Sequence, residues 1–366
     1  MDKLITVVIP TYNERDNVTP LVEKINGALS GYNHEVLFID DNSKDGTAQL
    51  ISALSAKYPV QVIVRLKERG LASAVVHGFK YAKGEIVAVM DADLQHPPQV
   101  LADLLKAVDA GADLVIASRY VKGGGCEGWG LVRRIISKGA IFLAHLFLPQ
   151  TRGISDPMSG FFMLRREVID GADLRPTGYK ILLEILMEGH YQKVAEVPYT
   201  FRVRERGKSK LSARQQIDYL KHLYSLMRRT GELVRFLKFC LVGASGVLVN
   251  QGLLWLLTQD VGLRSGLRLS LPSAIAIECS ILSNFTLNDF FTFPDRRLQG
   301  WKSFLMRLGR FNMVSLPGLA INMGILLLLT NQFGGEEYYL LFMFNLCGIA
   351  VAMLWNYLVN SWWTWK

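Results

Sequence analysis

Ile86-Val-Ala-Val-Met-Asp-Ala-Asp-Leu-Gln95 is the stretch that decides the fold of the larger part of this chain. A short apolar run ends abruptly in two carboxylates, which is typical of a buried strand that ends at a polar site. Similar apolar runs occur at Leu4–Ile9, Glu35–Ile39, Val62–Val64 and Asp113–Ala117. Helical patterns lie between them, for example at Gly46–Tyr58 and Leu71–Lys83. The alternation predicts an α/β domain with a parallel sheet covered by helices.

Polar residues follow four of these predicted strands. In an open α/β sheet, ligands bind at the carboxyl ends of the strands. The sequence therefore predicts one site to which four strand ends contribute. The contributing segments are Pro10–Glu14, Asp40–Thr47, Asp91–Gln95 and Ser118–Tyr120.

The pair Asp91 and Asp93 is chemically the most informative. Two carboxylates directly after a strand can hold Mg²⁺ together with a diphosphate, because Mg²⁺ takes few protein oxygens and completes its shell with phosphate and water. Gln95 adds a third oxygen. A cation held there would neutralise the charge that develops on a leaving nucleoside diphosphate.

The N-terminal 235 residues resemble the family 2 glycosyltransferases with a Rossmann-like GT-A fold, and among them the dolichyl-phosphate mannosyltransferases. The resemblance covers nearly all of this part of the chain. The motifs that carry it are Pro10-Thr-Tyr-Asn-Glu14, Asp41-Asn-Ser-Lys-Asp-Gly-Thr47, Gly70-Leu-Ala-Ser-Ala74, Asp91-Ala-Asp-Leu-Gln-His-Pro97, Ser118-Arg-Tyr120, Arg133-x-x-x-Ser137, Asp156-Pro-Met-Ser-Gly-Phe-Phe162 and Arg204-x-x-Gly207-x-Ser209-Lys210-Leu211.

The resemblance implies a role for each matching residue. Binding of the nucleotide-sugar is expected of Pro10, Tyr12, Glu14, Asp41, Asp91, Arg204 and Lys210. The expected ligands of Mg²⁺ or Mn²⁺ are Asp91, Asp93 and Gln95. The residues expected to bind the acceptor phosphate are Arg119, Arg133 and Ser137. The residues on which catalysis is expected to depend are Asp91, Asp93, Arg119 and Arg133.

The expected reaction is transfer of mannose from GDP-mannose to the phosphate of dolichyl or another polyprenyl phosphate. A phosphate monoester has its second pKa near ~6, so it is already ionised at neutral pH and needs no general base. Asp156 is therefore expected to shape the acceptor pocket. Direct displacement predicts inversion, giving a β-linked product. A glucosyltransferase that uses UDP-glucose is the alternative, because related enzymes share most of these motifs.

From Phe236 onward, long apolar runs dominate. Four segments of roughly 20 residues, the length that spans a bilayer as a helix, predict an all-α membrane domain. They lie at about 239–258, 270–293, 311–330 and 338–361. Ten basic residues flank one side of these spans and two flank the other. The positive-inside rule then places both termini and the catalytic domain in the cytoplasm.

The C-terminal part repeats itself at an offset of 72 residues. Lys238-Phe239 matches Arg310-Phe311, and Gly246-x-x-x-Asn250 matches Gly318-x-x-x-Asn322. Asn284-x-x-x-Asn288-x-x-x-Thr292-Phe293 matches Asn356-x-x-x-Asn360-x-x-x-Thr364-Trp365. We expect two copies of one helical hairpin in the same orientation, with paired asparagines forming hydrogen bonds between helices. These motifs resemble the GtrA-like family, whose members are linked to polyprenyl-linked sugars.

Two amphipathic segments, Leu131–Leu148 and Ala213–Leu233, are expected to lie at the membrane surface. The predicted organisation is a GT-A catalytic domain over 1–211, interface helices over 212–235 and a GtrA-like domain with four transmembrane helices over 236–366. No signal peptide is visible. The four cysteines are far apart and show no CxxC spacing, which predicts neither disulfides nor a zinc site.

Other classes of protein fit parts of the sequence. A flippase for lipid-linked sugars, fused to the transferase, stays open. A processive polysaccharide synthase is disfavoured because the Gln-x-x-Arg-Trp motif is absent. Gly123-x-Gly125-x-x-Gly128 fits a dinucleotide pattern but does not open a helix after the first strand, so we interpret it as an acceptor-side loop. The net charge of +9 is explained by the membrane flanks better than by nucleic-acid binding.

Overall fold

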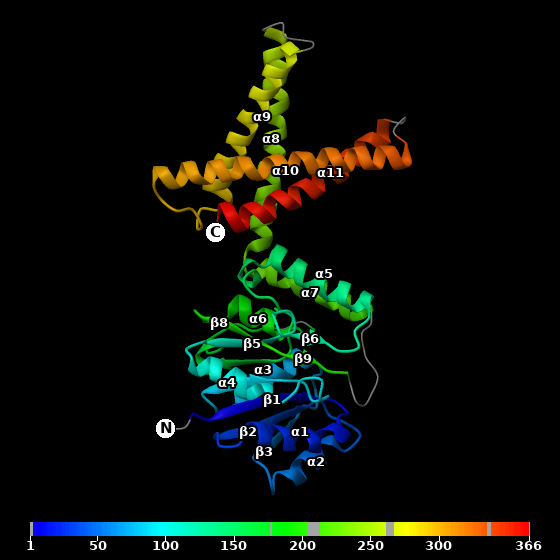
Figure 1. Cartoon of the computed structure of the whole chain (residues 1–366), viewed down its shortest axis with the longest axis vertical. Coiled ribbons are helices and arrows are strands. Elements are labelled where there is room, and N and C mark those ends of the chain that lie inside the picture. Colours follow the sequence, from blue (N-terminus) through cyan, green and yellow to red (C-terminus); the bar gives the residue numbers. More distant parts are fainter. Residues whose placement is uncertain (1–2, 176–177, 204–212, 261–266, 335–337, 366) are drawn as a thin grey trace. The chain divides into compact units, whose positions relative to one another are not determined.

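The structure is a computed structural model that describes the whole chain except residues 1–2, 176–177, 204–212, 261–266, 335–337 and 366 (Figure 1). It forms two compact units, Met1–Thr230 and Gly231–Lys366. Each unit buries its own set of apolar side chains.

The N-terminal unit is built on a seven-stranded sheet with the order β3-β2-β1-β4-β7-β5-β8. The strands are β1 (Ile5–Thr11), β2 (His34–Asp40), β3 (Val60–Val64), β4 (Ile86–Val89), β5 (Leu114–Ser118), β7 (Phe162–Arg165) and β8 (Val194–Pro198). The five predicted strands are confirmed. The sheet departs from the prediction at β7, which runs antiparallel to both β4 and β5. Phe162–Arg165 was not predicted as a strand from the sequence, although it is as long as β4.

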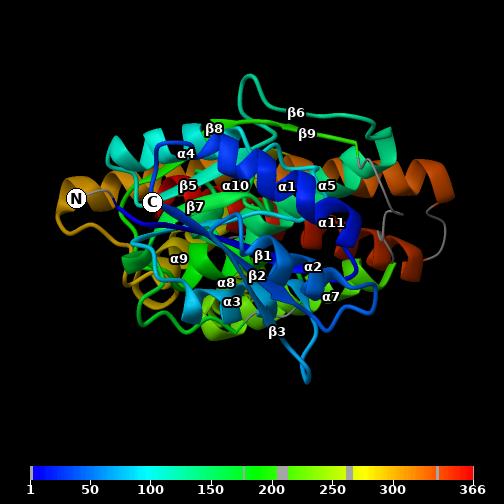
Figure 2. The same ribbon diagram turned by 90° about the horizontal axis from the view of Figure 1, so that it is seen from below.

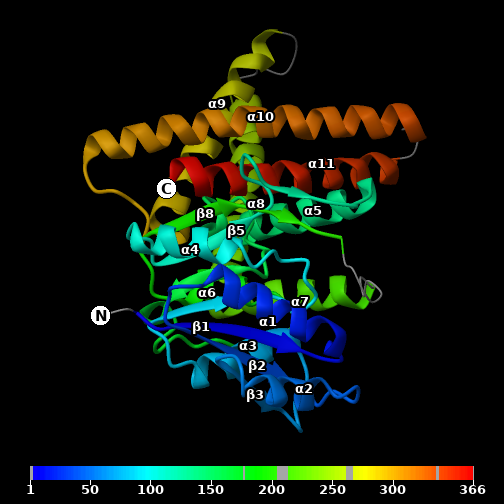
Figure 3. The same cartoon turned by 60° about the horizontal axis from the view of Figure 1, so that its bottom comes forward.

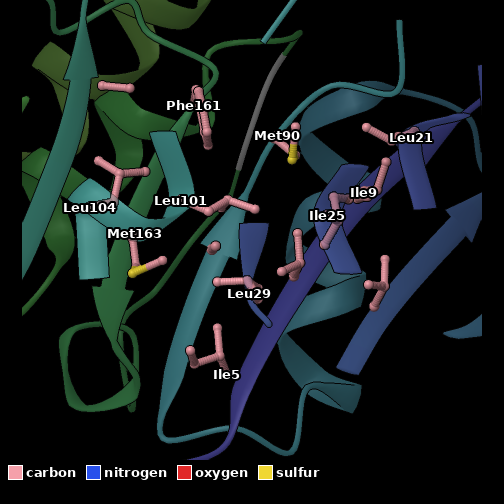
Figure 4. Close-up of a cluster of buried hydrophobic side chains, with 14 of the residues drawn as sticks. Ile5, Ile9, Leu21, Ile25, Leu29, Met90, Leu101, Leu104, Phe161 and Met163 are labelled. Atoms are coloured by element: carbon pink, nitrogen blue, oxygen red, sulfur yellow. The ribbon is translucent and has the colours of Figure 1, made fainter. Parts of the chain in front are cut away.

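Helices cover both faces of this sheet. One face packs against α1 (Arg15–Ala28), α2 (Thr47–Leu54) and α4 (Val100–Asp109), and the other against α3 (Leu71–Tyr81) and α6 (Ile181–Glu188). Figure 2 shows α1 and α4 on the opposite side of the sheet from α3. In α1, Val18, Leu21 and Ile25 recur at helical spacing and are fully buried. Leu21 and Ile25 lie beside Ile9 of β1 (Figure 4).

Two further helices of this unit, α5 (Leu131–Phe147) and α7 (Ala213–Arg229), lie side by side (Figure 1). The Tyr219 hydroxyl donates to the Ala140 carbonyl at 2.7 Å. Both predicted amphipathic segments are therefore helical, although the second ends at Arg229. Their exposed large apolar residues are Leu131, Val132, Ile135, Ile136 and Phe142 on α5, and Ile217, Leu220 and Tyr224 on α7.

A buried carboxylate fixes α7 to α6. Glu184 is fully buried and accepts hydrogen bonds from His222 at 2.8 Å and from Arg229 at 2.6 Å. Burial alone would raise the pKa of Glu184, but the bonds from these two side chains outweigh it and lower the pKa. Removing one partner of such a buried pair is strongly destabilising, so α6 and α7 form one rigid wall.

The C-terminal unit consists of two helical hairpins. The first contains α8 (Glu232–Asp260) and α9 (Leu267–Leu287), which continues into the π-helical turn η3 (Asn288–Thr292). The second contains α10 (Trp301–Phe333) and α11 (Tyr338–Val359), followed by the π-helical turn η4 (Asn360–Thr364). Figure 3 shows α10 and α11 running side by side.

Three helical stretches in the described part of this unit are long and apolar enough to cross a membrane: Glu232–Thr258, Trp301–Phe333 and Tyr339–Thr364. They correspond to the first, third and fourth predicted spans. The second predicted span corresponds to α9 and η3, which contain Glu278 and Asp289. That segment is not among the three.

The 72-residue repeat is visible in the contacts. A Cβ atom on Gly318 would lie 2.7 Å from the Asn356 side chain, and one on Gly246 would collide with Asn284 in the same way. Lys238 donates to the Phe291 carbonyl at 3.3 Å, and its repeat mate Arg310 donates to the Trp363 carbonyl at 2.9 Å. Both cations lie at the carbonyl end of a helix, where positive charge is favourable.

The expected hydrogen bonds between paired asparagines were a wrong prediction. In the described residues, Asn284 and Asn356 pack on glycine, and the Oδ1 atoms of both have no hydrogen-bond partner. Asn360 accepts a bond from Thr364 of the same helix at 2.7 Å. The glycines bring the helices so close that the amides meet backbone instead of each other.

Aromatic rings and an ion pair are among the contacts between the two hairpins. Phe293 stacks on its repeat mate Trp365, with ring centroids 4.4 Å apart. Asp289 accepts from Arg307 of the other hairpin at 2.9 Å and from the Trp365 indole at 2.8 Å. All four side chains are at least nine-tenths buried.

Candidate active site

A cavity of about 1130 Å³ lies at the carboxyl ends of β1, β2, β4 and β5 in the N-terminal unit. It contains every predicted site residue that the structure describes. Those lining residues are Pro10, Tyr12, Glu14, Asp41, Asp91, Asp93, Gln95, Arg119, Arg133 and Ser137. The other two predicted residues, Arg204 and Lys210, lie outside the described residues.

The ends of β1 and β2 form one wall of the cavity. Asp41 accepts from Arg65 Nε at 2.8 Å and from the Gly70 amide at 2.8 Å, so it is held from two directions. Arg69 lies over the Tyr12 ring, with the guanidinium carbon 5.0 Å from the centroid. Asn13 adopts a left-handed backbone with φ of 56°, which asparagine tolerates better than most residues. The wall is therefore fixed before any ligand arrives.

Asp91 and Asp93 lie just after β4, as predicted. Asp93 accepts from the Gln95 amide at 3.1 Å, and the Gln95 side-chain nitrogen donates to the Arg202 carbonyl at 2.9 Å. That bond leaves the Gln95 side-chain oxygen as the atom that can face a cation. Two carboxylates and one amide oxygen are the hard donors that Mg²⁺ and Mn²⁺ prefer. The described residues contain no group of three or more His, Cys, Asp or Glu side chains that could hold a metal, so phosphate and water would complete the shell.

His96 packs against the turn that carries Asp91 and Asp93. This role was not predicted from the sequence. Its ring is buried, stacks on Phe161 at 5.2 Å and accepts a hydrogen bond at Nδ1 from the Asp91 amide at 3.0 Å. Burial lowers the pKa of His96 to about 4, so the ring is neutral at neutral pH. A neutral ring is what the bond at Nδ1 requires.

Basic side chains form another part of the cavity lining, which we call the basic wall. Arg119 follows β5 and forms a bidentate pair with Asp156, with Nε–Oδ2 and Nη2–Oδ1 distances of 2.7 Å each. Burial alone would lower the pKa of Arg119, but the bonds from Asp156 raise it, so the guanidinium stays charged. Asp156 is fully buried and does not line the cavity. Its position agrees with the expectation that it shapes this wall.

Helix α5 brings Arg133 and Ser137 to the same wall. Arg133 lies over the Trp129 ring at 4.1 Å, and Ser137 accepts from the Tyr120 hydroxyl at 2.8 Å. Trp129 was not predicted, although an aromatic residue in a glycine-rich loop beside arginines was a usable signal. The loop itself is ordered by the pairing of β6 (Gly125–Cys126) with β9 (Thr200–Phe201). A Cβ atom on Gly124 would lie 2.6 Å from the Ser118 carbonyl oxygen, so the loop closely approaches the backbone after β5.

The fold, with two carboxylates and two arginines that line one cavity at the strand ends, defines a glycosyltransferase with a GT-A-like domain. Residues 6–171 match the family model described as glycosyl transferase family 2, and residues 238–365 match the one described as GtrA/DPMS, transmembrane domain. The chain belongs to glycosyl transferase family 2, and with its apolar C-terminal helices it is a membrane protein.

Particular relatives extend the likeness to the whole chain. It is 47% identical to the dolichol-phosphate mannosyltransferase of Pyrococcus furiosus over 99% of both chains. It is 38% identical to the Saccharomyces cerevisiae dolichol-phosphate mannosyltransferase over 64% of this chain and 92% of that one. It is 40% identical to the polyprenol monophosphomannose synthase of Mycolicibacterium smegmatis over 56% of this chain and 80% of that one. A crystal structure of a mycobacterial protein, 20% identical over 63% of this chain and 75% of that one, has a TM-score of 0.50 and shows the fold alone.

Proposed function

We propose that this glycosyltransferase moves mannose from GDP-mannose to the phosphate of dolichyl or another polyprenyl phosphate. The observation that carries the proposal is a single cavity lined both by two carboxylates, Asp91 and Asp93, which we call the acidic wall, and by Arg119 and Arg133 of the basic wall. Such walls suit a metal-bound diphosphate on one side and a phosphate monoester on the other. Relatives that cover the chain are named for this transfer.

On the acidic wall, Asp91, Asp93 and Gln95 would hold Mg²⁺ or Mn²⁺. When bound, the ion neutralises the charge on the leaving nucleoside diphosphate. Pro10, Tyr12, Glu14 and Asp41 would line the nucleotide subsite, and Arg204 and Lys210 would close over the donor.

On the basic wall, Arg119, Arg133 and Ser137 would orient the acceptor phosphate for attack on the sugar carbon. The phosphate oxygen is already anionic, so no residue needs to remove a proton. Asp156 supports this reading, because it is fully buried and bound to Arg119, so it is not placed to act as a base. Direct displacement by the phosphate gives the inverted, β-linked product.

The polyprenyl tail of the acceptor would account for the membrane domain and the interface segment of this chain. In this proposal, residues 1–211 form the catalytic domain and 212–235 an interface segment. Residues 236–366 form a four-helix anchor in which α9 and η3 supply the fourth span. The exposed apolar residues of α5 and α7 would contact the bilayer surface. The basic flanks favour a cytoplasmic position for the catalytic domain and both termini.

The test is transfer of radiolabelled sugar into organic-extractable lipid. Purified full-length protein receives GDP-mannose or UDP-glucose, a polyprenyl phosphate, and Mg²⁺ or Mn²⁺. We expect mannose in the lipid phase, lost with EDTA and carrying a β linkage. Transfer of glucose alone would identify UDP-glucose as the donor and would leave the proposed displacement by phosphate unchanged. No transfer from either donor would overturn the proposal.

A further inference from the structure

Lys180 is a cavity-lining cation to which the reaction described above assigns no role. It lies directly before α6, and that helix is fixed by the bonds of Glu184 to α7. The side chain is partly buried and shares the cavity with Asp91 and Arg119.

The ammonium group has few partners in the protein. Lys180 Nζ donates to the Met158 carbonyl at 2.8 Å and lies 4.8 Å from the Tyr179 ring centroid. Within the described part of the chain, no carboxylate forms an ion pair with it at 4.0 Å or less. An ammonium carries three N–H donors, so the bond to Met158 leaves two of them for a ligand.

Unlike Lys180, Arg119 forms an ion pair with a carboxylate. The guanidinium of Arg119 is neutralised by its bidentate pair with Asp156. Burial, together with the positive charges of Arg119 and Arg133, lowers the pKa of Lys180 to about 8, although Asp156 and Asp91 act against that shift. The lysine is thus mostly protonated at neutral pH, and no carboxylate in the described part of the chain forms an ion pair with it. A partly buried charge of this kind is stabilised when an anion binds next to it.

We propose that Lys180 donates to a phosphate oxygen of the reacting ligands and positions it within the cavity. The inference rests on the proposed function for the identity of those ligands. Lys180 lines the same cavity as Asp91, Arg119 and Arg133. The oxygen can therefore belong to the leaving diphosphate or to the acceptor monoester, and Lys180 is a positioning residue in either case.

The experiment measures binding without turnover on full-length protein. GDP with Mg²⁺ and citronellyl phosphate are titrated calorimetrically into wild type, Lys180→Gln and Lys180→Arg. Gln removes the charge but can still donate to Met158, and Arg keeps the charge. Lys106→Gln is the matched control, because Lys106 is an exposed lysine on α4 paired with Asp103. Melting temperatures identify folded variants, and Lys180→Met replaces the Gln variant if that one unfolds.

We expect Lys180→Gln to weaken one probe by about 10- to 100-fold, the usual worth of a charge-assisted hydrogen bond, and Lys180→Arg to restore most of it. Weaker citronellyl phosphate binding identifies the acceptor as the source of the oxygen, and weaker GDP binding identifies the leaving diphosphate. Unchanged affinity for both probes in a folded variant would overturn the inference. Because no sugar is transferred, the result stands even where the proposed mannosyl transfer fails.

Discussion

Charged side chains are used in opposite ways in the two units of this chain. In the N-terminal unit, Asp91, Asp93, Arg133 and Lys180 line a cavity where a ligand can reach them. In the C-terminal unit, Asp289 is bound by Arg307 and Trp365, and Glu232 accepts bonds from Arg235 and Arg296. The polar groups that line the cavity of the first unit can act on substrates, whereas the ion pairs named in the second unit hold its helices together. The comparison predicts that substitutions in the two units change different measured quantities.

The largest effect is expected from Asp93→Ala. Loss of a metal ligand should lower turnover by on the order of a thousandfold or more, because the bound ion contributes several kcal/mol to the transition state. The melting temperature should stay close to that of wild type. Sugar transfer into lipid and thermal unfolding in detergent measure the two quantities. Asp103→Ala, at an exposed carboxylate on α4, is the control and should leave both unchanged. Full activity of Asp93→Ala would remove the metal assignment.

The second prediction concerns Asp289→Asn, which should lower stability and leave turnover unchanged. It leaves the buried Arg307 without its carboxylate, which should cost about 3–5 kcal/mol of stability. Turnover per folded molecule should not change, because no ligand is expected to contact this pair. A folded Asp289→Asn protein that transfers no sugar would contradict the contrast between the two units. It would give the C-terminal unit a direct part in the reaction.

A pH-dependent effect is predicted for His96. Its pKa is about 4 in the folded protein and about 6.5 when unfolded, so between these values the unfolded chain binds a proton that the folded one does not. This contribution to stability is complete above pH 6.5 and is lost as the pH falls toward 4, by about 3 kcal/mol. His96→Gln removes the titration and should flatten the fall in melting temperature over this range. An identical pH profile in both proteins would contradict the buried neutral ring.

The smallest effects compare the two hairpins with each other. Gly246→Ala and Gly318→Ala each place a methyl group against an asparagine amide, which should cost about 1–3 kcal/mol. Because the two glycines are repeat mates, the melting temperatures of the two variants should fall by similar amounts. Gly243→Ala, where a Cβ atom meets nothing within 4 Å, is the control on α8. A large effect at only one of the two mates would show that the copies no longer pack alike.

Much of the candidate site followed from one rule of α/β sheets. Eight of the ten described site residues follow predicted strands and were expected at one edge, and all eight line one cavity. The other two, Arg133 and Ser137, came from the family resemblance and line the same cavity. Lys180 escaped this reasoning because it precedes a helix that follows β7, a strand that was not predicted from the sequence. His96 escaped because its role depends on burial under Phe161, and burial is a property of the packed chain.

The membrane part was predictable for a different reason. Hydropathy and a constant offset identify the hairpins without any knowledge of packing. How the asparagines pack was not predictable, because it depends on how closely glycine lets two backbones approach. The wrong expectation of hydrogen bonds between helices came from applying helical spacing without that distance.

The ion pair between the hairpins also makes the two copies of the repeat chemically different from each other. Arg235 and Arg307 are repeat mates, yet Arg235 binds Glu232 and Asp295, whereas Arg307 binds Asp289. The repeat mate of Asp289 is Ser361, which carries no charge. A domain assembled from two second hairpins would therefore enclose an arginine with no counter-charge. The pair between Asp289 and Arg307 therefore lets the second hairpin pair with the first hairpin and not with a second copy of itself.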